Sequence, residues 1–202
     1  MMIKFGTGGW RALIGEDFTK ENVRLLAQGI ADLMKSHSTG GPEEQLTFVI
    51  GYDRRFLSDK AARWLAEVLA GNGVKIYFIS RVAPTPLVMY TVKTMGTPYG
   101  ATITASHNPA DYNGVKLFTK GGRDAKEEIT TFLESLIAKV DPASIQSLAF
   151  EEGINQNRIE LIDPFNEYID TILSMIDTEV IKKRKLRIAL DPMYGVAKTC
   201  LQ

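Results

Sequence analysis

The sequence has 202 residues, and its 24 Lys and Arg balance its 24 Asp and Glu, which argues against a general nucleic-acid-binding protein because that class is usually basic. No apolar run approaches the ~18 residues of a membrane helix, no signal region opens the chain, and one cysteine with two histidines cannot form an intrachain disulfide or a common zinc site. We therefore expect a cytoplasmic protein that binds neither nucleic acid nor a membrane.

Helical and strand-like patterns alternate along the first part of the sequence. Apolar residues at helical spacing predict helices over residues 23–34 with Thr19 as the N-cap, 61–69 with Ser58 or Asp59 as the cap, 85–95 and 129–137. Apolar and β-branched runs predict strands over residues 46–50, 74–79, 99–104 and 115–118. This order predicts an α/β protein: a three-layer α/β/α domain over residues 1–142 with a mostly parallel mixed sheet.

A second unit is predicted to begin after a connecting stretch over residues 141–157. Within residues 158–202 we expect a helix over 165–176, a basic helix end at 182–185, and a strand over 186–190 that leads into a turn. The chain stops seven residues after that turn, so the last strand opens an unfinished βα unit. We therefore expect a fragment that holds only the start of a second α/β domain and exposes an apolar patch on its last helix or strand.

The most informative segment is the loop after the strand at residues 99–104, because open α/β sheets bind ligands at the carboxyl ends of their strands. It carries a hydroxyl on Ser106, an imidazole on His107, an amide on Asn108 and, further on, an ammonium on Lys116. A serine hydroxyl can carry a phosphoryl group, and cations offset the charge of the phosphoryl oxygens. The segment therefore suits phosphoryl chemistry.

Two other interpretations of this loop stay open at this point. It could be only a polar turn, since Pro109 and the Asn113-Gly114 pair favour a shaped loop by themselves. A serine hydrolase is less favoured, because the sequence lacks a Gly-x-Ser-x-Gly elbow. In an extended segment, moreover, Ser106 and His107 would point to opposite faces.

Two further segments could bind an anion. In residues 6–11, glycines would let backbone N–H groups approach a phosphate, and Arg11 could donate two hydrogen bonds to it. A glycine-rich turn with a solvated Arg11 is the simpler interpretation. Residues 51–58 follow the strand at 46–50 and are best explained as a helix-capping turn with an Asp–Arg pair, except for Arg55, which we predict to bind phosphate.

Taken together, these segments resemble the α-D-phosphohexomutases, a superfamily that includes phosphoglucomutase, phosphomannomutase and phosphoglucosamine mutase. Thr104-Ala105-Ser106-His107-Asn108-Pro109, with Asn113-Gly114-x-Lys116 behind it, resembles the family's phosphoserine loop. Residues 5–11 resemble its Gly-Thr-x-Gly-x-Arg motif, residues 51–55 its Gly-x-Asp-x-Arg motif, and residues 191–195 the turn that opens its second domain. The four matches follow the family's order along nearly the whole chain.

The resemblance implies an intramolecular phosphotransferase that interconverts hexose 1-phosphate and hexose 6-phosphate. Ser106 would carry the phosphoryl group, with hexose 1,6-bisphosphate as intermediate and activator and Mg²⁺ on a phosphoserine oxygen. Arg11 and Lys116 would contact the phosphoserine or the reacting hydroxyl, and Lys116 and His107 would assist proton transfer. The implied binding residues are Thr7, Gly8, Arg11, Arg55, Asn108 and Lys116.

The sequence also departs from the family's pattern. Members have about four domains, and the metal loop Asp-Gly-Asp-x-Asp-Arg, the sugar loop Gly-Glu-x-Ser-Gly and the C-terminal phosphate loop are absent here. The remaining metal ligands and domains II–IV would lie outside this chain, so we expect the fragment alone to be inactive. Phosphoglucosamine mutase and phosphopentomutase activities stay open, and a sugar-phosphate-binding module is the alternative that is not an enzyme.

Overall fold

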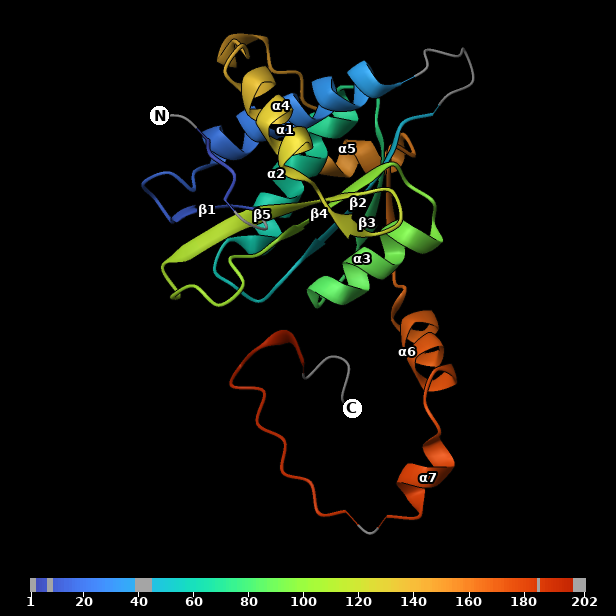
Figure 1. The fold of residues 1–202 in the computed structure, drawn as a ribbon. Coiled ribbons are helices and arrows are strands. Elements are labelled where there is room, and N and C mark those ends of the chain that lie inside the picture. The colour runs from blue at the N-terminus through green and yellow to red at the C-terminus, as the bar shows by residue number, and fades with distance from the viewer. Residues whose placement is uncertain (1–2, 7–8, 39–44, 185, 198–202) are drawn as a thin grey trace.

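The strands assemble into one seven-stranded sheet in the computed structural model, which describes residues 3–6, 9–38, 45–184 and 186–197 (Figure 1). The sheet order is β1-β5-β4-β2-β3-β7, and β6 pairs with the outer part of β5. The strands are β1 (Trp10–Leu13), β2 (Thr47–Tyr52), β3 (Lys75–Ile79), β4 (Tyr99–Ile103), β5 (Tyr112–Thr119), β6 (Arg123–Asp124) and β7 (Ile159–Ile162).

One strand runs against the others. β2 is parallel to β3 and β4, and β3 is parallel to β7, whereas β5 is antiparallel to β1, β4 and β6. Among the described strands, therefore, β5 alone has the opposite direction. This confirms the predicted mostly parallel mixed sheet.

Helices cover both faces of the sheet, which confirms the three-layer arrangement. Side chains from α1 (Lys20–His37), α2 (Ser58–Gly71), α4 (Glu127–Ile137) and α5 (Phe150–Asn155) share one apolar core with the sheet. A second core on the opposite face includes α3 (Thr85–Thr94) and the start of α6 (Phe165–Ser174). A 3₁₀ turn (Pro142–Ser144) precedes α5, and α7 (Thr178–Lys182) follows α6.

The predicted N-cap is correct for α1 and wrong for α2. Thr19 caps α1 as predicted, because its hydroxyl accepts a hydrogen bond from the Asn22 N–H. The predicted cap of α2 at Ser58 or Asp59 is wrong. The N-cap is Leu57, which has a left-handed φ of 65°, and the Ser58 hydroxyl donates instead to the Asp53 carboxylate.

Residues just after 158, where the second unit was predicted to begin, form the edge strand of the sheet. This strand is β7, which is hydrogen-bonded to β3, and Lys75 contacts residues at this edge. Its ammonium donates to the Asn157 carbonyl at 2.9 Å and lies 3.1 Å from a carboxylate oxygen of Glu160. The predicted connecting stretch therefore contains a helix, α5, and leads back to the sheet.

No described residue after α6 belongs to the sheet. The helix predicted over residues 165–176 is α6, which ends two residues earlier, at Ser174. The predicted basic helix end belongs to a separate helix, α7, whose last residue is Lys182. Residues 186–190 do not form the predicted strand, because a strand needs a neighbour to pair with and, within the described residues, none lies alongside. The turn that follows is present, with left-handed φ values at Met193 and Tyr194.

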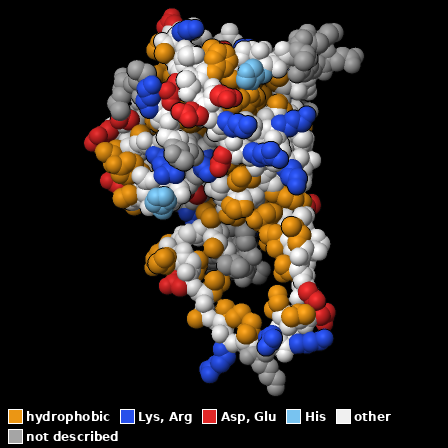
Figure 2. Space-filling model, viewed as in Figure 1, with side chains coloured by type: hydrophobic (Ala, Val, Ile, Leu, Met, Phe, Trp, Pro, Cys, Tyr) orange, Lys and Arg blue, Asp and Glu red, His pale blue; other side chains and the backbone are white. Residues whose placement is uncertain are grey.

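This C-terminal part exposes many apolar side chains, as predicted for the last helix or strand. Leu186, Ile188 and Leu190 are 62%, 79% and 58% exposed. Figure 2 shows hydrophobic side chains gathered around this part of the chain, and those on the helices and their connection are Ile172, Leu173, Met175, Ile176, Val180 and Ile181. None of the helices in the described ranges has the length and apolar character needed to cross a lipid bilayer.

The centre of the sheet depends on a close approach at Gly114. The Asn113-Gly114 pair, predicted as a turn, lies inside β5, where Gly114 pairs with Arg11 of β1 and accepts a hydrogen bond from the Thr104 N–H just after β4. A Cβ at Gly114 would overlap the Trp10 carbonyl oxygen and lie 3.0 Å from that of Thr104. Both neighbours are backbone, so the strands would have to separate.

We predict that Gly114→Ala destabilises the protein by about 2 kcal/mol, because overfilled positions in a packed sheet force backbone shifts. Chemical denaturation followed by circular dichroism measures the change. Gly6→Ala is the control, since its Cβ would meet nothing nearer than the Gly9 carbonyl oxygen at 3.9 Å. Equal stability of the two variants would contradict the close approach.

Candidate functional site

Two loops meet at the carboxyl ends of the central strands β2 and β4. The Asp53 N–H donates to the Ile103 carbonyl at 3.1 Å, so the two chains still lie together where the strands end. The loop that follows β4 joins it directly to the antiparallel strand β5, and we call residues 104–111 the serine loop. The serine loop and residues 53–56 line a hollow of about 710 Å³, to which the C-terminal turn at residues 193–196 also contributes.

Ser106 is exposed and lies in a left-handed turn with φ of 57°. Its N–H donates to the Thr104 hydroxyl at 2.9 Å, and its Oγ lies 3.4 Å from Nδ1 of His107. The backbone is therefore not extended here, and the prediction that Ser106 and His107 point to opposite faces is wrong. The imidazole lies near the hydroxyl, at a separation that is long for a hydrogen bond.

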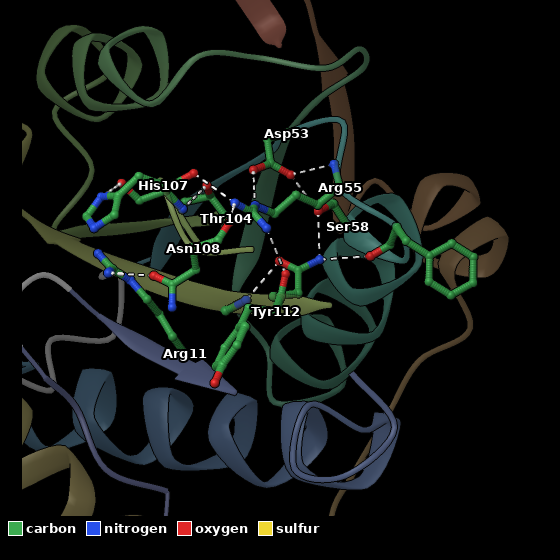
Figure 3. A network of polar contacts seen from close by, with 12 residues as sticks. Arg11, Asp53, Arg55, Ser58, Thr104, His107, Asn108 and Tyr112 are labelled. Atoms are coloured by element: carbon green, nitrogen blue, oxygen red, sulfur yellow. Dashed lines mark hydrogen bonds and ion pairs between the residues drawn. The ribbon is translucent and has the colours of Figure 1, made fainter. Parts of the chain in front are cut away.

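Arg55 holds the serine loop from inside. Its Nη1 donates to the carbonyl oxygens of Pro109 at 2.7 Å and Tyr112 at 3.0 Å. Its Nη2 donates to the carbonyl oxygens of Ser106 at 2.9 Å and Asn108. Figure 3 shows how these bonds join the Asp53–Ser58 segment to the loop from Thr104 to Tyr112.

These contacts differ from the phosphate-binding role predicted for Arg55. A guanidinium has two N–H groups on each terminal nitrogen, and all four are donated to backbone carbonyls. The side chain is only 15% exposed. In this structure the terminal nitrogens of Arg55 thus bind backbone carbonyl oxygens, whereas the prediction assigned them to phosphate oxygens.

A buried polar network supports Arg55. The Asp53 carboxylate accepts from the Arg55 N–H at 2.8 Å and the Ser58 hydroxyl at 2.7 Å, and it also pairs with the Arg55 guanidinium at 3.6 Å. The predicted Asp–Arg pair is thus present. The buried Asn113 amide donates to the Ser58 hydroxyl and the Phe56 carbonyl, both at 2.9 Å. The sequence analysis missed the roles of Ser58 and Asn113. Both are polar residues within otherwise apolar segments, and this pattern could have indicated buried hydrogen bonds.

Arg11 also reaches the serine loop. It lies in β1, not in a solvated turn, and its Nη1 donates to the Asn108 side-chain oxygen at 3.0 Å (Figure 3). Because Arg11 pairs with Gly114 and side chains alternate along a strand, Lys116 projects from the same face of the sheet as Arg11. The Lys116 ammonium is paired with the carboxylate of Asp124 in β6, at 3.0 Å. Thr7 and Gly8 lie outside the described residues.

The charge at this edge favours an anion. Three cations lie here: Arg11 and Arg55 approach the serine loop, and Arg54 is exposed beside it. Two carboxylates oppose them, Asp53, which accepts hydrogen bonds, and the exposed Asp111. Burial raises the pKa of the Tyr52 hydroxyl, with a further increase from Asp59 and an opposing effect of Arg63, so this phenol adds no negative charge at neutral pH. A local excess of cations attracts an anionic ligand even on a protein without net charge.

The described residues do not fit Mg²⁺ by themselves. Magnesium requires near-octahedral oxygen coordination, and carboxylates usually supply its protein ligands. Nowhere in the described ranges do three or more His, Cys, Asp or Glu side chains gather in a way that could hold a metal ion. A metal at Ser106 would therefore need ligands from beyond these residues.

Comparison with known proteins gives a consistent match. The family model for phosphoglucomutase/phosphomannomutase, alpha/beta/alpha domain I, matches residues 2–144, which overlap the first domain predicted over residues 1–142. The chain is 32% identical to the phosphoglucosamine/phosphogalactosamine mutase of Sulfurisphaera tokodaii over 95% of its own length and 39% of that protein. It is 44% identical to the “probable phosphoribomutase” of Schizosaccharomyces pombe over 59% of its length and 21% of that protein.

A solved structure shares the fold. The crystal structure of the “putative phosphomannomutase” of Thermus thermophilus matches with a TM-score of 0.74 and 30% identity. The match covers 89% of this chain and 38% of that one. The chain thus spans well under half the length of these related proteins.

We predict that Asn113→Ala lowers the free energy of unfolding by about 2 kcal/mol, because it removes the Asn113 partners of the buried Gly114 N–H and Ser58 hydroxyl. Urea denaturation measures the loss. The control is Asn155→Ala at the exposed end of α5, where a surface substitution changes stability by less than about 0.5 kcal/mol. A loss at Asn113 as small as the control's would show that the network contributes little.

Proposed function

This chain belongs to the phosphoglucomutase/phosphomannomutase family, and we propose that it forms the phosphate-carrying domain of a phosphohexomutase. The proposal is carried by one observation. Ser106 projects, exposed, from a loop whose backbone is fixed by Arg55, at a strand-end hollow with an excess of cations. A serine so placed suits reversible transfer of a phosphoryl group, which depends mainly on positioning and on charge neutralisation.

The proposed reaction has two balanced transfers. In the first, the bond between Ser106 Oγ and phosphorus breaks and a bond forms between phosphorus and a free hydroxyl oxygen of the hexose phosphate. That hydroxyl loses its proton and Ser106 Oγ takes one up, so that the products are hexose 1,6-bisphosphate and free Ser106. In the second transfer the bond between the other phosphorus and its sugar oxygen breaks and a bond from that phosphorus to Ser106 Oγ forms. The Ser106 hydroxyl loses its proton, the sugar oxygen takes one up, and the isomeric hexose phosphate is released.

The described side chains have distinct proposed roles in these transfers. His107, 3.4 Å from Ser106 Oγ, is placed to exchange a proton at the reacting oxygen. Arg11 neutralises phosphoryl charge from its position against Asn108, whose amide it also orients. Lys116 joins them by leaving Asp124, with which it is paired in this structure.

We propose that further domains of the same protein complete the site. The second domain predicted over residues 158–202 would be incomplete here, and the exposed apolar side chains of α6, α7 and residues 186–194 would pack against its remainder. Those domains would supply the oxygen ligands that a Mg²⁺ ion beside the phosphoserine requires, as well as the sugar-binding residues. A cytoplasmic location remains part of the proposal.

Glucose and mannose phosphates are the proposed substrates, because the family is named for their mutases. Hexosamine and pentose phosphates are the alternatives, since the two related proteins are named as a phosphoglucosamine/phosphogalactosamine mutase and a phosphoribomutase. A module that only binds a sugar phosphate would use the same cationic hollow without transferring the phosphoryl group.

The 202-residue chain should show negligible mutase turnover by itself. We expect no measurable conversion of glucose 1-phosphate with Mg²⁺ and glucose 1,6-bisphosphate present, because the metal and sugar ligands are missing. A coupled assay that detects glucose 6-phosphate checks this. Robust turnover would refute the requirement for further domains.

Replacement of Ser106 separates the enzyme from the binding module. In the complete protein, Ser106→Ala should lower turnover by roughly 10³-fold or more, since it removes the group that carries phosphate. Ser174→Ala, at the exposed end of α6, is the matched control and should retain full activity. If neither wild type nor variant turns over and both bind glucose 6-phosphate equally, the binding module is correct.

A further inference from the structure

We propose that Arg55 is a positioning residue, which shapes the serine loop and sets the direction of Ser106 and is not a phosphate ligand. The shape of the loop can be tested on the chain alone. Only the consequence for phosphoryl transfer rests on the function proposed above.

The hydrogen bonds leave Arg55 no terminal donor for a ligand. Its two terminal nitrogens contact carbonyl oxygens at both ends of the loop and in its middle, from Ser106 to Tyr112. The loop therefore curves around one planar cation. A cation in the middle of a ring of carbonyl dipoles stabilises that curvature, because charge-assisted hydrogen bonds are about twice as strong as neutral ones.

Arg55 is itself held by Asp53, which is the first member of a chain of hydrogen-bonded side chains. Asp53 accepts from its N–H and pairs with its Nε, and the same carboxylate is fixed by the Ser58 hydroxyl at the start of α2. Ser58 in turn accepts from the buried amide of Asn113 in β5. The guanidinium is thus anchored to β2, α2 and β5 before it meets the loop, so it can act as a template for the loop's backbone.

The template fixes the serine. The Ser106 carbonyl is held by Arg55 and its N–H by the Thr104 hydroxyl, so both backbone polar groups are occupied. The residue keeps a left-handed φ of 57°, a conformation that is unfavourable for a non-glycine residue and persists only where the surroundings impose it. With the backbone set in this way, the side chain is directed outward to the hollow.

Lysine could keep the charge of Arg55 but not its geometry. An ammonium has three donors on one atom, whereas the four carbonyls here are bound by two nitrogens of a flat fork. Arg55→Lys therefore distinguishes a positioning role from a general electrostatic one. Arg63→Lys is the matched control, because Arg63 is a half-exposed surface residue of α2 that pairs with Glu151.

The first experiment measures amide hydrogen exchange by NMR in the 202-residue chain. The Ser106, Asn108 and Tyr112 N–H groups are hydrogen-bonded within the serine loop and report its shape. We expect their exchange to become about tenfold faster in Arg55→Lys, since two or more loop bonds are lost, while exchange in β2 and β4 stays unchanged. Arg63→Lys should leave all these rates unchanged. Unchanged loop exchange in Arg55→Lys would overturn the proposal.

If Arg55→Lys does not fold, Asp53→Asn gives the same test. The amide keeps an oxygen for the Arg55 N–H and the Ser58 hydroxyl but loses the ion pair with the guanidinium, so the loop rates should rise by about threefold, the factor that corresponds to a weak ion pair. No change in those rates would count against the anchoring of Arg55.

The second experiment uses the complete protein and measures by mass spectrometry how fast glucose 1,6-bisphosphate phosphorylates Ser106. In Arg55→Lys we expect a rate about 100-fold lower at saturating bisphosphate and an unchanged half-saturating concentration, because a misplaced nucleophile slows transfer without weakening binding. A higher half-saturating concentration with an unchanged rate would assign Arg55 to phosphate binding. If the wild-type complete protein is never phosphorylated but the exchange result holds, the proposed function fails and the positioning role stands.

Discussion

The serine loop depends on where its backbone carbonyls point, and a single guanidinium decides this. Arg55 binds carbonyl oxygens at both ends of the loop, while Asp53 and the buried Asn113 network hold Arg55 against β2, α2 and β5. The charge of Arg55 is thereby committed to the architecture of the loop. The cations left to meet a ligand come from elsewhere, with Arg11 on β1 the nearest to the loop among those with a described contact.

Much of the fold could be predicted because the spacing of apolar residues along the sequence indicates which side chains are buried in a helix or strand. The helices α1 to α4 and the strands β2 to β5 have long apolar patterns, and they were found. The short strands β1, β6 and β7 have two to four residues, too few for a pattern. β1 and β7 exist through pairing with strands that are distant in the sequence, and β6 pairs with the end of the preceding strand β5. For the same reason residues 186–190, with a clear strand pattern and no neighbour alongside among the described residues, form no strand.

The site was predictable in its residues and less so in their contacts. The sequence placed Ser106 and His107 at a strand end, and the family resemblance implied that Arg11 lies beside them. In the structure Arg11 contacts Asn108 of the same loop. The sequence could not tell that Arg55 binds carbonyls, because an arginine pairs with carbonyl and phosphate oxygens by the same geometry. The pairing of Lys116 with Asp124 was equally hidden, since it depends on how the strand β6 folds back on β5.

The reversed direction of β5 has a consequence for how the site would operate. Loops at this edge of a parallel sheet normally lead away to a helix, but the serine loop returns at once to the next strand and is a hairpin tip anchored in the middle of the sheet. Such a tip has little freedom to travel. A phosphoryl group on Ser106 would be stationary, so the two ends of a sugar would have to be presented to it in turn, and the turning would belong to the small molecule.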